Sequence, residues 1–298
     1  MSGKYGNLTR NRRQLQAWLL LFGALALALG SASCESGPQP PQPGTPAFFW
    51  GSAKESYRTG DFVRTDEQLQ RILATDNATG NEFVARARAW DIVISAGLAQ
   101  GYMEMADAFE AGARMNRANP TPFRKQVTTL RSYASSAAIE FAEGVHKFIA
   151  QNKDPNVVLA FAYPAGSLAQ PGGLSKIASG MLVQDSERDL LQTSMLQRGV
   201  SQAVCKALDS ADNAAKAAEK LKTGEAQVPR NAFLWAAAKM LEQESQLYAP
   251  NKLDQPNRFI LMAEQALEAL KEIPETKDSK ALAEKVKKAL DKLKKPGV

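Results

Sequence analysis

The sequence predicts an all-α fold assembled from αα-hairpin repeats. Apolar residues recur at intervals of three and four in almost every segment after Pro46, which is the period of an amphipathic helix. Short glycine-containing segments separate successive stripes, as in the turn of an αα-hairpin. The main exception is 152–180, where three prolines and four glycines interrupt the period. We therefore expect a helical-repeat domain at 47–298 with an insertion at 152–180.

The first 33 residues have the composition of an export signal. Four basic residues and no acidic ones precede an apolar run at 17–29, and the small residues Gly30–Ser33 follow it. This run has the length of a signal-peptide core, whereas a helix that crosses a bilayer needs about 20 apolar residues. We expect 1–33 to be a cleaved signal peptide. The alternative is an uncleaved membrane anchor.

Cys34 follows these small residues directly. The order Ala32-Ser33-Cys34 resembles the end of a bacterial lipoprotein signal, although Ser31 stands where such signals carry leucine. The resemblance implies a lipid on Cys34 and a place on the periplasmic face of a bacterial membrane, with the outer membrane as the expected one. A diacylglyceryl group has the two chains that stable anchoring needs. Ser31 and Ser33 also suit an ordinary signal peptidase, so cleavage without lipidation stays open.

Residues 34–46 form a tether between this cysteine and the first helix. They contain five prolines, which favour an extended polyproline conformation of about 3.1 Å per residue. A tether of this composition holds the folded part up to about 35 Å from a membrane.

The charge of the chain argues against a nucleic-acid partner. The formal net charge is +6, but the excess of basic over acidic residues lies in the first 33 residues and in the lysine-rich tail from Lys271. The segment between them has 24 basic and 26 acidic residues. We therefore expect no extended basic surface for nucleic acid in the helical domain.

The clearest hairpin lies at 48–73. Its two apolar stripes and its turn consist of Phe49, Ala53, Tyr57, Gly60-Asp61-Phe62, Leu69 and Ile72. These residues resemble a tetratricopeptide repeat, with a departure at Thr65, where that repeat usually has alanine. The resemblance implies a solenoid of stacked hairpins with a concave binding face.

The rest of the chain predicts further helices. We expect a second hairpin from helices at 82–97 and 103–115, with a turn at Gln100-Gly101-Tyr102. A long helix should run from the Asn-Pro-Thr-Pro segment at 119–122 to about Gln151. The remaining predicted helices are 185–208, 210–222, 229–248, 258–273 and 279–295. The last has lysines opposite its apolar stripe and resembles the helix that caps a solenoid.

The sequence contains no motif for catalysis, a metal or a cofactor. Its single histidine, His146, would have to support a zinc site or a catalytic triad alone. Gly172-Gly173 lacks the Gly-Lys-Ser/Thr that completes a phosphate-binding loop. Cys205 lies in an apolar helical pattern and is expected to be a buried thiol. We expect a protein that is not an enzyme.

Two binding functions remain. The first is a membrane-tethered scaffold for a protein or peptide partner. The second is a carrier of a small apolar ligand, which would resemble the T-components of tripartite transporters. Either function would use large aromatic residues that no single hairpin buries. The candidates are Trp90, Tyr102, Phe161, Tyr163 and Trp235, and the alternative is that all five belong to the core.

Overall fold

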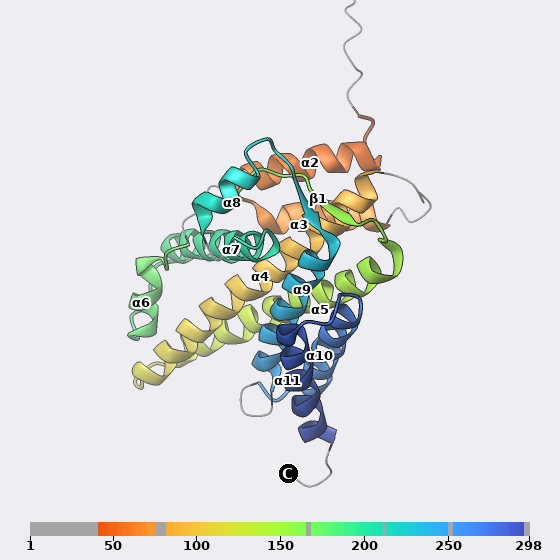
Figure 1. The fold of residues 1–298 in the computed structure, drawn as a ribbon. Coiled ribbons are helices and arrows are strands. Elements are labelled where there is room, and N and C mark those ends of the chain that lie inside the picture. Colours follow the sequence, from red (N-terminus) through yellow and green to blue (C-terminus); the bar gives the residue numbers. More distant parts are fainter. Residues whose placement is uncertain (1–40, 75–81, 165–167, 211–212, 250–252, 295–298) are drawn as a thin grey trace, which may run out of the picture. The chain divides into compact units, whose positions relative to one another are not determined.

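The computed structural model describes residues 41–74, 82–164, 168–210, 213–249 and 253–294 (Figure 1). The chain divides into two units, Met1–Pro41 and Gln42–Val298, and the helices and strands described below belong to the second. The predicted signal peptide, Cys34 and most of the tether lie outside the described residues. The described part is mostly helical, which confirms the all-α class. No helix in these ranges combines the length and the apolarity that a membrane crossing requires.

The first predicted hairpin is confirmed. Helix α2 is Pro46–Arg58 and helix α3 is Phe62–Ala74. Gly60 in the turn has a φ of 80°, in the left-handed region that favours glycine. Thr65, the departure from the repeat pattern, is buried and donates a hydrogen bond to the carbonyl oxygen of Asp61 at 2.8 Å. Its hydroxyl is therefore satisfied inside the hairpin.

The second predicted hairpin is wrong. Residues 82–115 form one continuous helix, α4 (Glu82–Met115), and the expected turn at Gln100-Gly101-Tyr102 lies inside it. The glycines there allow close packing against α7 (Asp185–Ala207). A Cβ atom on Gly101 would lie 2.8 Å from the carbonyl oxygen of Met195, and one on Gly199 would lie 2.2 Å from that of Gly97. These glycines bring two helix backbones together.

Helix α4 is the centre of the described fold. It packs most extensively against α5 (Thr121–Gln151) and α7, and also contacts α3 and α6 (Gly172–Ala178). Every residue from Ala87 to Ala99 is buried, so this part of α4 is enclosed on all sides. A solenoid helix contacts mainly its neighbours in sequence. Helix α4 instead contacts elements from both halves of the chain.

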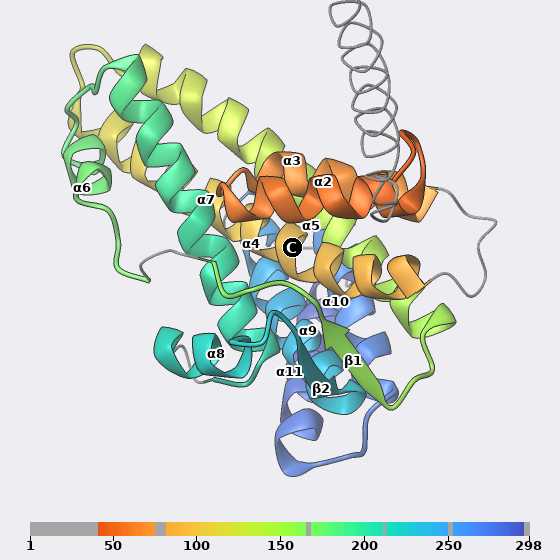
Figure 2. The same ribbon diagram turned by 90° about the horizontal axis from the view of Figure 1, so that it is seen from above.

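The insertion at 152–180 contains the strand β1 (Asn156–Leu159) and the short helix α6. Strand β1 pairs antiparallel with β2 (Ala226–Pro229), with Val157 opposite Val228 (Figure 2). The sequence did not predict β2, because a strand of four residues has too few positions for a recognisable alternation. This pair joins the insertion to the start of the C-terminal helices.

The predicted C-terminal helices are confirmed with small shifts at their ends. Helix α9 is Arg230–Ser245, followed by the 3-10 turn η1 (Gln246–Tyr248), α10 (Pro256–Lys271) and α11 (Lys277–Lys294). Helix α8 is Ala214–Lys220, shorter than the predicted 210–222. Helix α10 packs against α9, α5 and α11.

Candidate functional site

Two of the predicted aromatic residues meet in the core. The ring centroids of Trp90 and Phe161 lie 4.4 Å apart, and both side chains are buried. Phe161 also contacts Trp50 and Tyr57, at centroid distances of 5.1 and 4.8 Å. Phe161 therefore joins the insertion to helices α2 and α4 and is not available to a partner.

The other three aromatic candidates do not share a surface with Trp90 and Phe161. Tyr102 is buried beside Tyr133, with their ring centroids 5.3 Å apart. Tyr163 is half-buried, and its hydroxyl lies 3.7 Å from the sulfur of Cys205. Cys205 is fully buried, as expected. Trp235 is half-buried on α9, with the Lys239 ammonium 5.2 Å from its ring centroid. Only Tyr163 and Trp235 retain appreciable exposure.

His146 lies on the surface of α5. Its Nδ1 is 3.0 Å from a carboxylate oxygen of Glu268 on α10. Within the described ranges, no group of three or more histidine, cysteine, aspartate or glutamate residues is placed to hold a metal ion. His146 is thus a surface contact between two helices.

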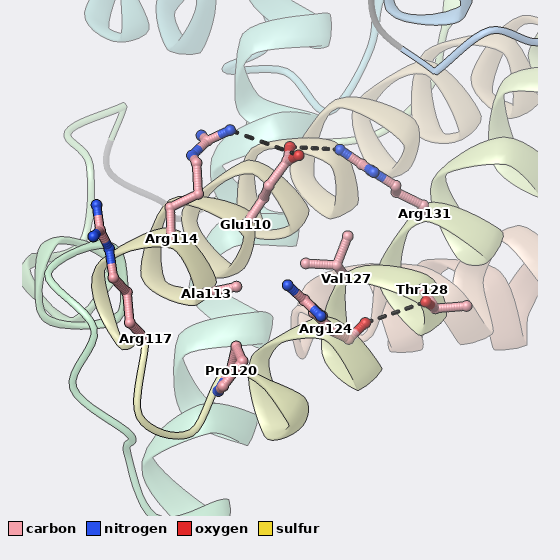
Figure 3. Close-up of a pocket in the computed structure, with 9 residues that line it drawn as sticks. All are labelled: Glu110, Ala113, Arg114, Arg117, Pro120, Arg124, Val127, Thr128 and Arg131. Carbon is pink, nitrogen blue, oxygen red and sulfur yellow. Dashed lines mark hydrogen bonds and ion pairs between the residues drawn. The ribbon is translucent and has the colours of Figure 1, made fainter.

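The strongest candidate site is a cavity that the sequence did not predict. It lies between the C-terminal end of α4 and the N-terminal end of α5 and has a volume of about 590 Å³ (Figure 3). Four arginines line it together with a single carboxylate. The lining residues are Glu110, Ala113, Arg114, Arg117, Pro120, Arg124, Val127, Thr128 and Arg131.

The turn from α4 to α5 beside this cavity is supported by contacts with α6 and the residues that follow it. A Cβ on Gly112 would lie 2.3 Å from the carbonyl oxygen of Ile177, so glycine lets α6 pack closely on α4. The Asn116 side chain donates to the carbonyl oxygen of Gly180 at 3.1 Å and accepts from the backbone N–H of Asn119 at 3.1 Å. These contacts support the turn from both sides.

Glu110 neutralises only part of the positive charge. Its carboxylate lies 2.6 Å from the Arg131 guanidinium and 3.7 Å from that of Arg114. Arg117 and Arg124 are exposed and form no ion pair with any of the described residues. The Nε of Arg131 is buried and has no acceptor among those residues. The cavity therefore presents excess positive charge and an unused donor, which suit carboxylate or phosphate oxygens.

A second cavity of about 410 Å³ adjoins the first, because both are lined by Glu110, Arg114 and Arg131. Its other lining residues are Met103, Asp107, Leu247 and Leu253. This part of the surface is less basic, because two arginines and the carboxylates of Asp107 and Glu110 line it.

A buried carboxylate cluster lies at the opposite end of α4. Burial and the nearby Glu140 charge raise the pKa of Asp91 to about 7. Asp66 on α3 has a pKa raised well above its usual value, chiefly by burial and then by Asp91 and Glu140. The Gln70 amide donates to Asp91 at 2.6 Å, and Gly144 leaves room for the second oxygen. This cluster holds protons near neutral pH between α3, α4 and α5.

The arginines escaped sequence analysis because the helical domain as a whole has balanced charge. Arg114 and Arg117 precede the Asn-Pro turn, and Arg124 and Arg131 follow it at a helical spacing of seven. A local count of charges across residues 114–131 would have identified the cluster.

Comparisons of the chain with protein-family models, with curated proteins and with solved structures found no significant match.

Proposed function

We propose that this chain is a membrane-tethered helical scaffold that binds an acidic segment of a partner protein at the arginine-lined cavity. The observation that carries the proposal is the set of four arginines around one cavity with one carboxylate among them. Charge-assisted hydrogen bonds from guanidinium groups to carboxylates are stronger than neutral ones and can be bidentate. Arg117 and Arg124 are the residues expected to bind first, because Glu110 engages the other two.

The location of the scaffold belongs to the same proposal. The apolar run at 17–29, the lipoprotein-like Ala32-Ser33-Cys34 and the proline-rich tether support export and a lipid anchor on the periplasmic side of a membrane. The α2–α3 hairpin supports the relationship to tetratricopeptide repeats, which serve as binding scaffolds. The acidic partner would then be a protein within reach of that membrane.

A second candidate function is the binding of a small anionic ligand. The volume of about 590 Å³ lies within the range of roughly 300–1,000 Å³ typical of small-molecule sites. The charged lining favours a carboxylate-containing ligand over the apolar ligand considered from the sequence.

Site-specific photo-crosslinking in cells tests the proposal. A photoreactive residue replaces Thr128, which is exposed and lines the cavity. We expect a protein adduct that disappears in the variant Arg117→Gln/Arg124→Gln. The matched control Lys288→Gln/Lys292→Gln removes the same charge from exposed positions on α11 and should retain the adduct.

An adduct that persists in the arginine variant would overturn the proposed protein site. Calorimetry of the purified full chain with citrate then addresses the small-ligand candidate. Citrate binding that the arginine variant loses and the lysine control keeps, without any protein adduct, would favour the small anionic ligand.

A further inference from the structure

Large apolar side chains are exposed at one corner of the fold, beside the arginine-lined cavity. Within the described ranges, the large apolar side chains that are more than half exposed are Met115, Met181, Leu182 and Leu190. They belong to the end of α4, the segment after α6 and the second turn of α7, which gather at one corner in Figures 1 and 2. A single exposed apolar residue is common on protein surfaces, whereas adjoining ones mark places where a partner binds.

The cap of α6 brings Met181 next to Met115. Gly180 follows α6 in the left-handed conformation, with a φ of 89°. The N–H groups of Gly180 and Met181 donate to carbonyl oxygens in the last turn of α6, at 2.9 and 3.1 Å, which is the Schellman arrangement of a helix end. A Cβ atom on Gly180 would lie 3.2 Å from the Cβ of Met115, so Met115 lies directly against this cap. Met115, Met181 and Leu182 therefore start from adjoining points of the backbone, and we call these three side chains the corner patch.

The same cap leaves the corner patch uncovered. In a Schellman cap, the residue at the position of Met181 often packs against an apolar residue in the last turn of the helix. Here that position in α6 is Lys176, whose ammonium instead lies 3.0 Å from the carboxylate of Glu187. Met181 remains 54% exposed, and Met115 and Leu182 are 67% and 52% exposed. Apolar area that such a cap usually buries is thus available to a partner.

The corner patch adjoins the arginines that form no ion pair. Met115 directly follows Arg114 and precedes Arg117 by two residues, and both arginines line the cavity. Arg117 and Arg124 form no ion pair with the described residues, and in Figure 3 their side chains lie apart from the Glu110 carboxylate. The Cα atoms of Met115 and Arg117 are at most about 7 Å apart, because consecutive Cα atoms are separated by about 3.8 Å. One short segment can therefore contact both the patch and the arginines.

We infer that the partner segment carries a large apolar residue close to its acidic residues, and that this residue covers the corner patch while the acidic ones bind Arg117 and Arg124. This inference rests on the proposed function and specifies its partner. The short distance from Met115 to Arg117 places the apolar and acidic residues of the partner within about four residues of each other. Methionine side chains are unbranched and polarizable, so the patch can adapt to apolar residues of different shapes.

The start of α7 makes an anionic bilayer a poorer fit to this corner than a protein segment. Asp185 and Asp189 follow Leu182 by three and seven residues, and their side chains are 86% and 73% exposed. Arg188 lies 2.9 Å from Asp185 and 3.7 Å from Asp189, so it offsets one of their two charges. A flat anionic surface laid across the corner would approach these carboxylates. A short segment can contact the patch from the arginine side alone.

Fluorescence anisotropy with synthetic peptides tests the inference on the full chain. The probe has a block of glutamates and a pair of leucines, with about four residues between the centres of the two groups, in keeping with the short distance from Arg117 to the corner patch. A matched peptide has serines in place of the leucines, and both are also made in reversed order. We expect the glutamate–leucine peptide, in one of its two orders, to bind about tenfold tighter than its serine counterpart, because the leucines lose apolar surface to the patch.

Variants of exposed residues separate the patch from the arginines. Met181→Ser/Leu182→Ser should abolish the difference between the leucine and serine peptides, with little change in the salt dependence of binding. The matched control Phe48→Ser/Val63→Ser removes exposed apolar side chains from α2 and α3 and should keep that difference. Arg117→Gln/Arg124→Gln should weaken both peptides and reduce the salt dependence. Thermal unfolding of each variant verifies that the fold is retained, and the comparison of peptides on the unmodified chain needs no variant.

Equal affinity of the leucine and serine peptides for the unmodified chain, or a difference that survives Met181→Ser/Leu182→Ser, would overturn this inference. If the arginine variant still weakened both peptides, the proposed acidic site would stand. If neither peptide bound, or if the arginine variant bound both as well as the unmodified chain, the proposed function would fail as well.

Vesicles test the bilayer as the alternative partner. A lipid anchor would enter phosphatidylglycerol and phosphatidylcholine vesicles alike, so the comparison of the two isolates the effect of lipid charge. We expect neither kind of vesicle to displace the glutamate–leucine peptide. Displacement by phosphatidylglycerol vesicles alone would overturn the protein segment in favour of an anionic bilayer.

Discussion

At the scale of single residues, glycine determines how closely the helices approach one another. Gly97, Gly101 and Gly199 lie where α4 crosses α7, and a Cβ on any of them would meet backbone atoms of the other helix at under 3.0 Å. Helix formation by itself disfavours glycine by about 1 kcal/mol relative to alanine. The close crossing therefore depends on residues that weaken each helix in isolation.

We predict that Gly199→Ala destabilises the protein although alanine has the higher helix propensity. The added methyl group would lie 2.2 Å from the Gly97 carbonyl oxygen, so the helices must separate at a cost of about 1–3 kcal/mol or more. Urea unfolding followed by circular dichroism measures the change. The control is Gly51→Ala on α2, where no atom lies within 4 Å of the new methyl group and stability should increase by up to about 1 kcal/mol. Equal stability of the two variants would contradict the close-crossing interpretation.

At the scale of elements, the insertion and the α2–α3 hairpin are attached to α4 through different interactions. The insertion contributes an aromatic side chain, Phe161, which packs against Trp50, Tyr57 and Trp90. The hairpin also contributes carboxylate and amide groups, from Asp66 and Gln70, that face Asp91 and Glu140. The first attachment should be insensitive to pH, whereas the second should depend on it.

Phe161→Ala should lower the free energy of unfolding by about 3–5 kcal/mol, the usual cost of truncating a buried aromatic residue. Trp235→Ala serves as the comparison. Because Trp235 is only half-buried, its truncation should lower the free energy of unfolding by less. Chemical denaturation of both variants tests whether the Phe161 substitution causes the larger loss of stability. A Phe161 variant as stable as the unmodified chain would mean that the insertion does not contribute to the core.

The carboxylate cluster predicts that stability falls as the pH rises. In the folded state the pKa of Asp91 is raised from 3.8 to about 7, so between these values the folded chain holds a proton that the unfolded chain has lost. Its contribution is complete at low pH and is lost as the pH rises through about 7. The ionised form of Asp91 is favoured by the hydrogen bond from Gln70 and by the positive charges of Lys147 and Arg88. These interactions oppose the repulsion from Glu140. Burial has the largest influence on the pKa of Asp91, so this pKa stays above its ordinary value.

We therefore expect the melting temperature to decrease between pH 5 and pH 8, and the decrease to be smaller in Asp91→Asn. Asparagine preserves an acceptor for the Gln70 amide, which donates at 2.6 Å. Part of the pH dependence of the melting temperature should persist in Asp91→Asn, because burial also raises the pKa of Glu244 to about 7. Asp278→Asn on α11 is the control and should leave the pH profile unchanged. Identical profiles for Asp91→Asn and the unmodified chain would exclude Asp91 as a source of the effect.

At the scale of the whole molecule, the arginine-lined cavity and the start of α2 lie toward opposite ends of α4. The central helix spans 34 residues, which corresponds to about 50 Å. The start of α2 lies near the N-terminal end of α4, as the contact between Trp50 and Phe83 indicates. A partner bound at the arginine-lined cavity would then lie at a distance from the start of α2, where the proposed tether ends.

The anchor proposal predicts the behaviour of Cys34→Ala. If Cys34 carries the lipid, this variant should move from the detergent phase to the aqueous phase in Triton X-114 partition, because the acyl chains supply the membrane affinity. Mass spectrometry of the mature N-terminus shows whether cleavage has occurred. A variant that stays in the detergent phase with the mass of the uncleaved chain would support the alternative of a membrane-anchored signal segment.

The sequence alone determined the helical class, the α2–α3 hairpin, the long α5 and the C-terminal helices, because apolar periodicity and proline or glycine boundaries are local properties. Tertiary structure decided what local patterns leave ambiguous. Gly101 resembled a turn residue, but it is the point where α7 approaches α4. Phe161 resembled an exposed anchor, but its neighbours come from α2 and α4. The arginine-lined cavity exists because the turn at 116–120 folds Arg124 and Arg131 back beside Arg114 and Arg117, and that proximity depends on packing between helices.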